Sequence, residues 1–504
     1  MKKTGFNRKP EKEHAMLEII PEKQFPLSPY LYMQFAEPLG NADSSVDAAW
    51  DYVGCRWQPD TVALLQYLAP PMIRWGGCFA SYYHWRDAVG PRDKRKPMLN
   101  LCWDGMFSNQ VGTAEFMELC RLLGSEPLMC VNMESDGRST WAEPFPGTDL
   151  RGTAQEAAEW VAYCNDPSDP LRRKHGAEAP YRIRYWQIGN ETSYGYWEAN
   201  GKRKFVRDGF SCSEAAEATL RFARAMRNID PELRLIAWGD DGWAPEICER
   251  TGELIDLIAF HCHFNCNRNN SGAILTSRYY RQEPAQAWEQ LMRAGTFLEA
   301  KIKELEEQTR PYGKRLAMTE GHFCIDDGRD RGDVLCSWAA GVAYARNLNI
   351  FARHGERLEI ATSADFFGNR WRVNAVMLPT PAYAFRPYLM PVGGVMGLFS
   401  RHSGKFSIPV TCTEPYADIT ASMDGNRIFL HIVNTSPEHG VELPFHIASR
   451  TIRQADAWEI CADPWDEINA LEPERFRPRK RKIDPQSYRL PAAGVAAVEL
   501  ILEP

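Results

Sequence analysis

The feature that most constrains the fold is a regular alternation of helical and strand patterns between Tyr30 and Ser363. Segments with apolar residues at helical spacing, such as the one from Thr113 to Leu123, are followed by short apolar runs. Repeated helix and strand units predict an α/β protein, and eight parallel strands close into a (β/α)8 TIM barrel. The candidate strands are Tyr30–Phe35, Pro71–Trp75, Leu128–Asn132, Ile183–Ile188, Leu233–Trp238, Leu254–His261, Leu316–Thr319 and Leu358–Ser363.

The pattern changes after Arg372, where short alternating runs separated by Pro, Gly and Asn replace the helical period. This change is typical of a β-sandwich. A chain of 504 residues is long enough for a barrel of about 250 residues or more and a smaller domain. We therefore predict a barrel over residues 30–371, a C-terminal sandwich over 372–504, and an N-terminal segment over 1–29 that could supply one sandwich strand.

Two of the candidate barrel strands are followed directly by a carboxylate. The run from Tyr185 to Ile188 leads through Gly189 and Asn190 to Glu191, and the run ending at Thr319 leads to Glu320. The carboxyl ends of barrel strands form the reaction face, and two carboxylates there are the minimum equipment of a glycoside hydrolase. A glutamate at a strand end can also be an exposed residue without a catalytic role. The placement of both glutamates at strand ends favours the catalytic interpretation. A retaining pair would lie about 5 to 5.5 Å apart.

Several motifs in chain order resemble one known family. They are Gln34–Gly40, Arg74–Ala80, Tyr83–Trp85, Gly90–Arg92, Glu115–Met117, Trp186–Glu191 and Ile255–His261. Together they resemble the α-L-arabinofuranosidases of glycoside hydrolase family 51, which are retaining (β/α)8 enzymes. The Asn190-Glu191 pair alone would indicate only the wider clan, whereas the ordered set is more specific.

The resemblance implies roles for particular residues. It makes Glu191 the general acid/base and Glu320 the nucleophile, with Asn190 bonding the sugar 2-hydroxyl and Arg74 helping to keep Glu320 ionised. Asn190 could instead cap a turn, and Arg74 could form a surface ion pair. The substrate-binding residues that the resemblance implies are Glu37, Arg74, Cys78, Asn132, Asn190, His261 and His263.

The sequence departs from the family pattern at several points on the substrate side. Only four residues run from Arg74 through Gly77 where the family usually has five, and Pro38 stands where many members have a histidine. His263 replaces a tyrosine that would contact the nucleophile, and Gly321-His322 follows Glu320 in place of the usual surroundings. The reaction type is therefore better supported than the identity of the sugar.

A metal site can also be considered at the end of the sixth strand. His261, His263 and Cys266 offer imidazole and thiolate, the ligand types that zinc prefers. No second ligand cluster at a recognised spacing accompanies them, so the sequence favours histidines that are hydrogen-bonded around Glu320. We predict no metal and no cofactor.

Composition and charge narrow the choice of partners. The formal net charge is -7 with both signs mixed along the chain, which predicts no nucleic-acid partner. The sequence has no apolar run of about 18 residues that would span a membrane, and its first ten residues lack the apolar core of a signal peptide. The 14 cysteines are scattered through apolar contexts, as reduced thiols would be. These features predict a cytoplasmic protein, and the resemblance suggests a homo-oligomer.

The predicted function is that of a retaining exo-glycosidase that removes terminal α-L-arabinofuranosyl groups from oligosaccharides. One alternative is another retaining glycosidase of the same clan that acts on xylosyl, glucosyl or galactofuranosyl residues. A second alternative is a sugar-binding pseudoenzyme. The presence of both Glu191 and Glu320 argues against the second alternative.

Overall fold

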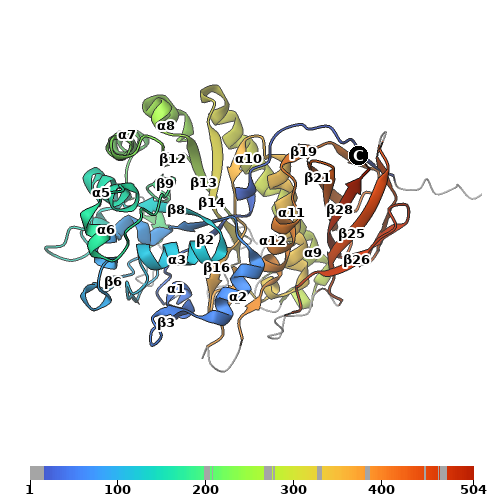
Figure 1. Cartoon of the computed structure of the whole chain (residues 1–504), viewed down its shortest axis with the longest axis horizontal. Helices are drawn as coiled ribbons and strands as arrows, with labels where there is room; N and C mark the ends of the chain where they lie inside the picture. Colours follow the sequence, from blue (N-terminus) through green and yellow to red (C-terminus); the bar gives the residue numbers. More distant parts are fainter. Residues whose placement is uncertain are drawn as a thin grey trace, which may run out of the picture.

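The computed structural model contains a barrel and a separate set of β-sheets that lie side by side (Figure 1). It describes residues 16–41, 43–197, 205–206, 208–265, 275, 279–325, 332–380, 386–447, 450–463, 465 and 474–503. In Figure 1 the barrel is coloured from blue through green and yellow to orange, and the large C-terminal sheet is orange-red to red.

Eight parallel segments form the barrel. In spatial order they are β2 (Gln34–Ala36), β5 (Met72–Trp75), β8 (Glu126–Val131), β9 (Tyr185–Ile188), β12 (Arg234–Trp238), β13 (Leu257–Asn265), β14 (Arg315–Cys324) and β15 (Leu358–Ile360). The chain continues from β15 into β16 (Asp365–Gly368), which pairs in parallel with β2. The interrupted eighth strand therefore closes the barrel. Two further strands, β17 (Asn374–Met377) and β18 (Tyr388–Leu389), extend the sheet beyond β16.

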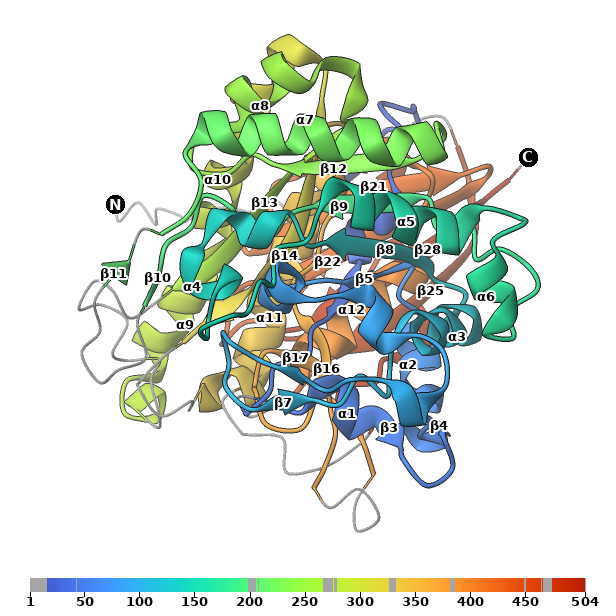
Figure 2. The same cartoon turned by 90° about the vertical axis from the view of Figure 1, so that its left-hand side faces the viewer.

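Helices cover the outside of the strands, as Figure 2 shows for α5, α7 and α8. The 18-residue α7 illustrates why they form, because Ser211 and Glu214 make a capping box at its start and Phe222 and Met226 are on its buried face. The main helices are α2 (Pro59–Leu68), α3 (Thr113–Leu123), α5 (Ala154–Asn165), α7 (Cys212–Ile229), α8 (Ala244–Thr251), α9 (Pro284–Met292), α10 (Ala294–Thr309), α11 (Trp338–Arg353) and α12 (Pro391–Arg401).

Shorter elements lie in the connections. The short helices are α1 (Ser45–Ala49), α4 (Ser139–Ala142) and α6 (Pro170–Lys174). The short strand pairs are β3 (Trp50–Asp51) with β4 (Arg56–Trp57), β6 (Met98–Leu99) with β7 (Met106–Phe107), and β10 (Tyr196–Trp197) with β11 (Phe205–Val206).

One expectation about a single element is corrected. The first strand does not begin at Tyr30, because Pro29–Tyr32 forms a 3-10 helix in which the Ser28 hydroxyl accepts a hydrogen bond from the Tyr30 amide. Between β13 and β14, the helices α9 and α10 follow each other and are separated at Arg293.

The C-terminal part forms a sandwich around its own core. One sheet contains β19 (Phe406–Ile408), β21 (Ala417–Asp424), β22 (Arg427–Asn434), β28 (Val495–Leu502), β25 (Ile452–Ile460) and β26 (Arg479–Lys482). The others contain β20 (Val410–Cys412), β1 (Leu17–Ile19) and β24 (Phe445–Ile447), and the pair β23 (Val441–Leu443) with β27 (Tyr488–Leu490). Buried apolar residues of these sheets form one cluster, separate from the barrel core.

The N-terminal segment and the domain boundary can now be placed in the fold. Leu17–Ile19 pairs with strands on both sides in a sandwich sheet. The boundary predicted at residue 371 stays a proposal, and a position near residue 402 agrees better with the structure. The reason is that β17 and β18 continue the barrel sheet, while α12 packs against α11 and α2.

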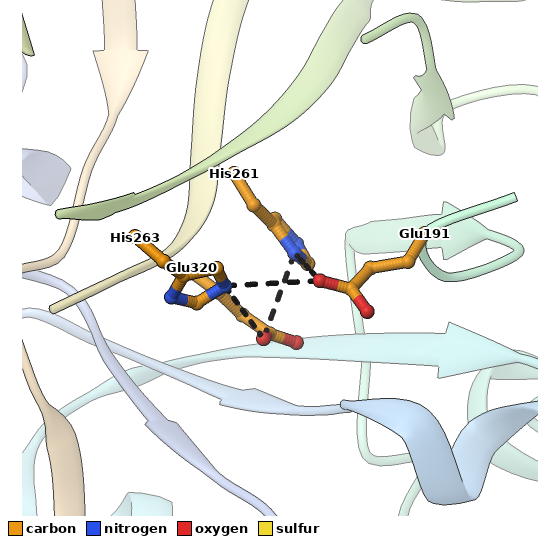
Figure 3. Close-up of side chains that lie close together, drawn as sticks. All are labelled: Glu191, His261, His263 and Glu320. Atoms are coloured by element: carbon orange, nitrogen blue, oxygen red, sulfur yellow. Dashed lines mark hydrogen bonds and ion pairs between the residues drawn. The ribbon is translucent and has the colours of Figure 1, made fainter. Parts of the chain in front are cut away.

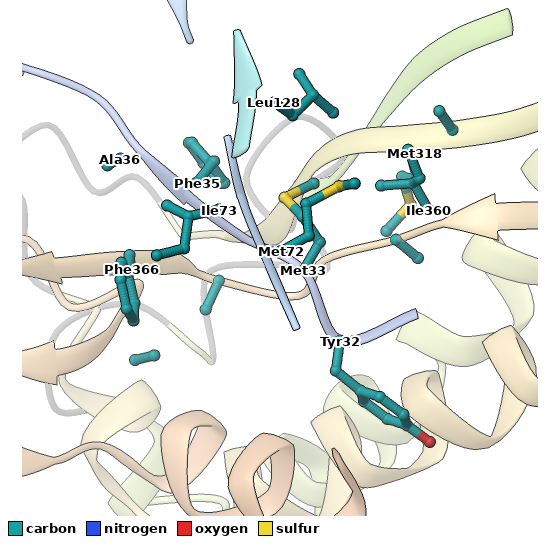
Figure 4. Close-up of a cluster of buried hydrophobic side chains, with 14 of the residues drawn as sticks. Tyr32, Met33, Phe35, Ala36, Met72, Ile73, Leu128, Met318, Ile360 and Phe366 are labelled. Atoms are coloured by element: carbon teal, nitrogen blue, oxygen red, sulfur yellow. The ribbon is translucent and has the colours of Figure 1, made fainter. Parts of the chain in front are cut away.

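Apolar side chains from the barrel strands form the larger core (Figure 4). Phe35, Ile73, Leu128 and Met318 are each at most 1% exposed. The cysteines that the structure describes are all free thiols. Among the described residues, no helix combines the length and the apolar character needed to cross a membrane.

Candidate active site

Glu191 is held by a loop that turns sharply away from its strand. β9 ends at Ile188, and Gly189 and Glu191 both have positive φ, 75° and 51°. A Cβ on Gly189 would lie 2.6 Å from the carboxylate of Asp136, so this close approach requires glycine. A non-glycine residue at positive φ is strained, and surrounding contacts must hold it.

Those contacts come from Asp136 and Arg138, both buried. The Asp136 carboxylate accepts hydrogen bonds from the Asn190 amide at 3.1 Å and the Thr192 hydroxyl at 2.7 Å. Arg138 donates to the Glu191 carbonyl at 2.6 Å. Sequence reasoning missed both residues, because only the tertiary fold brings them to this loop.

Glu320 lies within a strand and not at its end, which corrects the sequence-based expectation. β14 runs on to Cys324, and its partner β13 runs on to Asn265, with a register shift between Phe260 and His261. In this extension His261 is the neighbour of Glu320, and His263 is the neighbour of His322. Continued pairing therefore brings the two histidines of β13 to the carboxylate of β14.

The structure brings Glu191, His261, His263 and Glu320 together into what we call the His–Glu cluster, and their side chains point toward one another (Figure 3). One ligand atom from each residue lies within 4.8 Å of all the others. The two carboxylates, which come from β14 and the loop after β9, are thus as close as a retaining pair requires and much closer than about 9 Å.

Arg74 links the site from the end of β5. Its guanidinium donates to Glu320 at 2.8 Å, to Gln187 at 2.9 Å and to the Asn190 side-chain oxygen at 2.6 Å. The side chain is fully buried, so the ion pair with Glu320 is shielded from water. Arg74 therefore contacts both Glu320 and Asn190, and the role that the resemblance implies for it, keeping Glu320 ionised, stays a prediction.

Gln187 was not among the candidates. Gln187 is a polar residue of β9, whose four residues are all buried. A polar residue within an otherwise apolar strand pattern is the one signal in the sequence that indicates such a role.

Glu37 is buried close to the cluster. The indole nitrogen of Trp103 donates to its carboxylate at 3.1 Å. Burial, together with the nearby charge of Glu320, raises the pKa of Glu37 well above its usual range. Gly77 has a φ of 141°, and a Cβ there would lie 2.2 Å from the Glu37 carboxyl carbon. The second glycine of the Gly76-Gly77 pair is thus required by the close packing of Glu37.

Cys78 and Asn132 lie differently with respect to the cluster. The Cys78 thiol donates to Glu191 at 3.7 Å, which brings it to the reaction face. The Asn132 side chain donates to the Leu150 carbonyl at 2.8 Å and accepts from the Ser135 amide at 2.9 Å. Among the described hydrogen bonds, none joins Asn132 to either carboxylate, so its sugar-binding role stays a prediction.

The two histidines set the charge of Glu191. Burial would raise the pKa of Glu191, but the hydrogen bond with His261 and the nearby imidazole of His263 outweigh it and hold the pKa well below its usual range. Burial also opposes charge on His263, but the carboxylates of Glu191 and Glu320 raise its pKa overall. The nearest contact, His261 Nδ1 to Glu191 Oε1, is 2.9 Å, so protons can move between imidazole and carboxyl.

Some buried polar atoms beside the cluster have no hydrogen-bond partner. Among the described residues these include Nδ2 of Asn190 and Nδ1 of His263. Buried polar groups are normally paired, so an unpaired donor at a reaction face is available to a bound molecule. His322 and Asp365 are a further buried pair, with Nδ1 and Oδ1 3.2 Å apart but not aligned as a hydrogen bond.

Comparison with known proteins agrees with this geometry. Residues 64–282 match the family model described as the alpha-L-arabinofuranosidase 1 domain. An intracellular exo-alpha-L-arabinofuranosidase of Bacteroides ovatus is 24% identical over 96% of this chain and 93% of its own length. The resemblance to the family 51 α-L-arabinofuranosidases is confirmed.

Two further relatives define the extent of this resemblance. Alpha-L-arabinofuranosidase C of Emericella nidulans is 36% identical over 250 residues, which cover 47% of this chain. The chain matches only 44% of the length of that fungal protein. A family 51 α-L-arabinofuranosidase from Bifidobacterium longum has a TM-score of 0.78 at 18% identity, covering 96% of this chain and 99% of its own. The predicted fold, a TIM barrel with a C-terminal sandwich, is thereby confirmed.

Proposed function

We propose that the protein is a retaining exo-glycosidase that removes terminal α-L-arabinofuranosyl groups from oligosaccharides. The observation that carries this proposal is the pair Glu191 and Glu320, with carboxylate oxygens within 4.8 Å of each other. Glu320 also receives a hydrogen bond from the buried Arg74. A retaining mechanism needs two carboxyl groups at this separation.

In the proposed mechanism, Glu320 attacks the anomeric carbon while Glu191 donates a proton to the leaving oxygen. The anomeric carbon becomes bonded to Glu320, and the aglycone leaves as an alcohol. Glu191, now ionised, then takes a proton from water, and the resulting hydroxide attacks the same carbon and releases Glu320. Arg74 keeps Glu320 ionised and correctly oriented.

The proton that Glu191 donates is shared with the imidazoles of the cluster. His261 lies at hydrogen-bond distance from Glu191, so a proton held on the ring can pass to the carboxyl group when the leaving oxygen needs it. Asn190 keeps a free Nδ2 donor for the sugar 2-hydroxyl, because its oxygen is already bonded to Arg74. Its orientation is thereby set for the sugar.

The choice of sugar follows from the relatives whose names specify α-L-arabinofuranose. The Bacteroides ovatus relative is described as intracellular and exo-acting, which supports action in the cytoplasm on chain ends. Nucleic acid and membranes are not proposed as partners, and no cofactor is proposed. A homo-oligomer stays a prediction.

A panel of aryl glycosides tests the proposal. We expect the α-L-arabinofuranoside to give the highest kcat/KM, ahead of β-xyloside, β-glucoside and β-galactofuranoside. A higher value for another sugar would support the alternative of a different glycosidase in the clan. Sugar binding without turnover on any member of the panel would support the pseudoenzyme. Proton NMR of the first-formed product tests retention separately, because an inverting enzyme would release the opposite anomer.

A further inference from the structure

The His–Glu cluster offers the ligand types of a transition-metal site. It contains two imidazoles and two carboxylates, and both types bind zinc in proteins. The four ligand atoms are Nδ1 of His261, Nε2 of His263, Oε1 of Glu191 and Oε2 of Glu320. The sequence suggests His261 and His263 with Cys266, which lies outside the described residues, whereas the structure adds the two carboxylates from other segments.

Four of the six distances between these atoms are close to those around a tetrahedral ion, and the other two are at most 4.8 Å. His261 Nδ1 lies 2.9 Å from the Glu191 oxygen and 3.5 Å from the Glu320 oxygen. His263 Nε2 lies 3.7 Å from the first oxygen and 3.9 Å from the second. Zinc bonds of about 2.0 to 2.1 Å in a tetrahedron place neighbouring ligand atoms about 3.3 to 3.4 Å apart. Small adjustments of the side chains would therefore equalise the four contacts around one ion.

We infer that the His–Glu cluster is a binding site for a single divalent transition-metal ion, with zinc the best match, and that this ion competes with the sugar. Zinc would take two neutral imidazoles and two ionised carboxylates, so any protons on these groups leave when it binds. Both glutamates would then be ligands. Neither could donate a proton to a leaving oxygen or attack a sugar.

The surroundings of the cluster favour ordered ligands. His261 is buried, and its Nε2 lies 3.0 Å from the Thr319 hydroxyl, which fixes the ring with Nδ1 toward the carboxylates. Arg74 holds the other oxygen of Glu320 at 2.8 Å. Outer contacts of this kind orient metal ligands and strengthen binding.

His263 completes the set. A tyrosine at this position, as in the family pattern, would leave one histidine and two carboxylates. The fourth ligand is therefore a property of this chain's own His261-Cys262-His263 sequence.

Calorimetric titration of the EDTA-treated, full-length protein with zinc chloride tests the site directly. We expect one tightly bound ion per chain. His263→Tyr and Glu191→Gln, which remove ligands from two different segments, should each weaken binding at least tenfold. His439→Tyr is the matched control, because His439 is exposed and lies between β22 and β23 of the sandwich. The zinc affinity of this variant should equal that of the unmodified protein.

Two results would overturn the inference. One is the absence of zinc binding to the unmodified protein, and the other is equal affinity in both ligand variants when circular dichroism shows them folded. Cobalt provides a second readout, because a tetrahedral Co²⁺ ion in the cluster should give visible absorption that His263→Tyr removes.

The inhibitory consequence rests on the proposed function. Zinc should act as a competitive inhibitor of arabinofuranoside hydrolysis, reversed by EDTA, and full activity with zinc bound would contradict this step. Calorimetry and cobalt absorption need no turnover. A failure of the proposed sugar specificity would therefore leave the metal site intact, and the two failures can be told apart.

Discussion

The two carboxylates of the site are supported in different ways. Glu191 stands in a loop at positive φ, and side chains from another loop, above all Asp136, hold it in place. Glu320 lies inside β14, where main-chain pairing with β13 positions it. A strained loop depends on a few side-chain contacts, whereas a paired strand spreads its support over many backbone bonds. We therefore expect Glu191 to be easier to misplace than Glu320.

The largest expected effect separates the chemical roles of the two carboxylates. Glu320→Ala should lower kcat/KM by at least about 10⁴-fold on every substrate, because no other group can form the covalent intermediate. Glu191→Ala should lose about 10² to 10⁴-fold on a disaccharide but far less on a dinitrophenyl glycoside, whose leaving group needs no proton.

Azide provides the check on this assignment. It should restore turnover of Glu191→Ala on the dinitrophenyl glycoside, because it can attack the glycosyl intermediate without a general base. It should not restore Glu320→Ala by forming the retained product. The reverse pattern in the two variants would exchange the roles.

The contrast between loop and strand also explains what the sequence could predict. Most strands of the barrel, and both glutamates, follow from local periodicity and from residues next to each strand. The 3-10 helix at Pro29–Tyr32 and the interruption of the eighth strand do not. Asp136 could not be predicted, because its contact with Asn190 depends on how two loops pack in three dimensions. The extension of β14 past Glu320 was missed for a similar reason, since the residues after Thr319 are fixed by pairing with β13 and not by their own pattern.

The second prediction tests the weaker support of the Glu191 loop. Asp136→Asn keeps the size of the side chain but replaces one acceptor oxygen with a donor, and Asp136 accepts from Asn190, Thr192 and Ser81. Displacement of Glu191 by about 1 Å would lower kcat on the order of 10²-fold. Steady-state kinetics on a disaccharide checks this.

Asp208→Asn is the matched control for Asp136→Asn. Asp208 accepts from the exposed Ser139 hydroxyl, and the loss of that contact should leave kcat within about twofold. Full activity of a folded Asp136→Asn variant would show that the loop does not depend on this carboxylate, and the proposed difference between loop and strand would then fail.

The third prediction concerns the strand side. Thr319→Val retains the shape of the side chain but removes the hydroxyl that contacts His261 Nε2 at 3.0 Å. An unpaired buried ring nitrogen costs about 1 to 3 kcal/mol, yet main-chain pairing still holds Glu320. We expect kcat to fall only about threefold to tenfold, with KM little changed. A fall in kcat as large as that of Asp136→Asn would mean that the strand does not hold Glu320 more firmly than the loop holds Glu191.

The smallest expected effect is a shift in the pH profile caused by His263→Tyr, measured with EDTA present so that no metal competes. Burial acts to raise the pKa of Glu191, and the hydrogen bond with His261 and the nearby imidazole of His263 lower it. Removal of one imidazole should therefore raise the pKa of Glu191, so that the general acid keeps its proton to higher pH. The basic limb of kcat/KM should move upward by about one pH unit.

The acidic limb should change less in His263→Tyr, because Glu320 keeps its hydrogen bond from Arg74 in this variant. The direction of the shift is decisive. A basic limb that moved to lower pH would mean that His263 itself must be charged for catalysis. An unchanged basic limb in the folded variant would mean that His263 does not share protons with Glu191. The pKa of Glu191 would then depend on its hydrogen bond with His261 and not on His263.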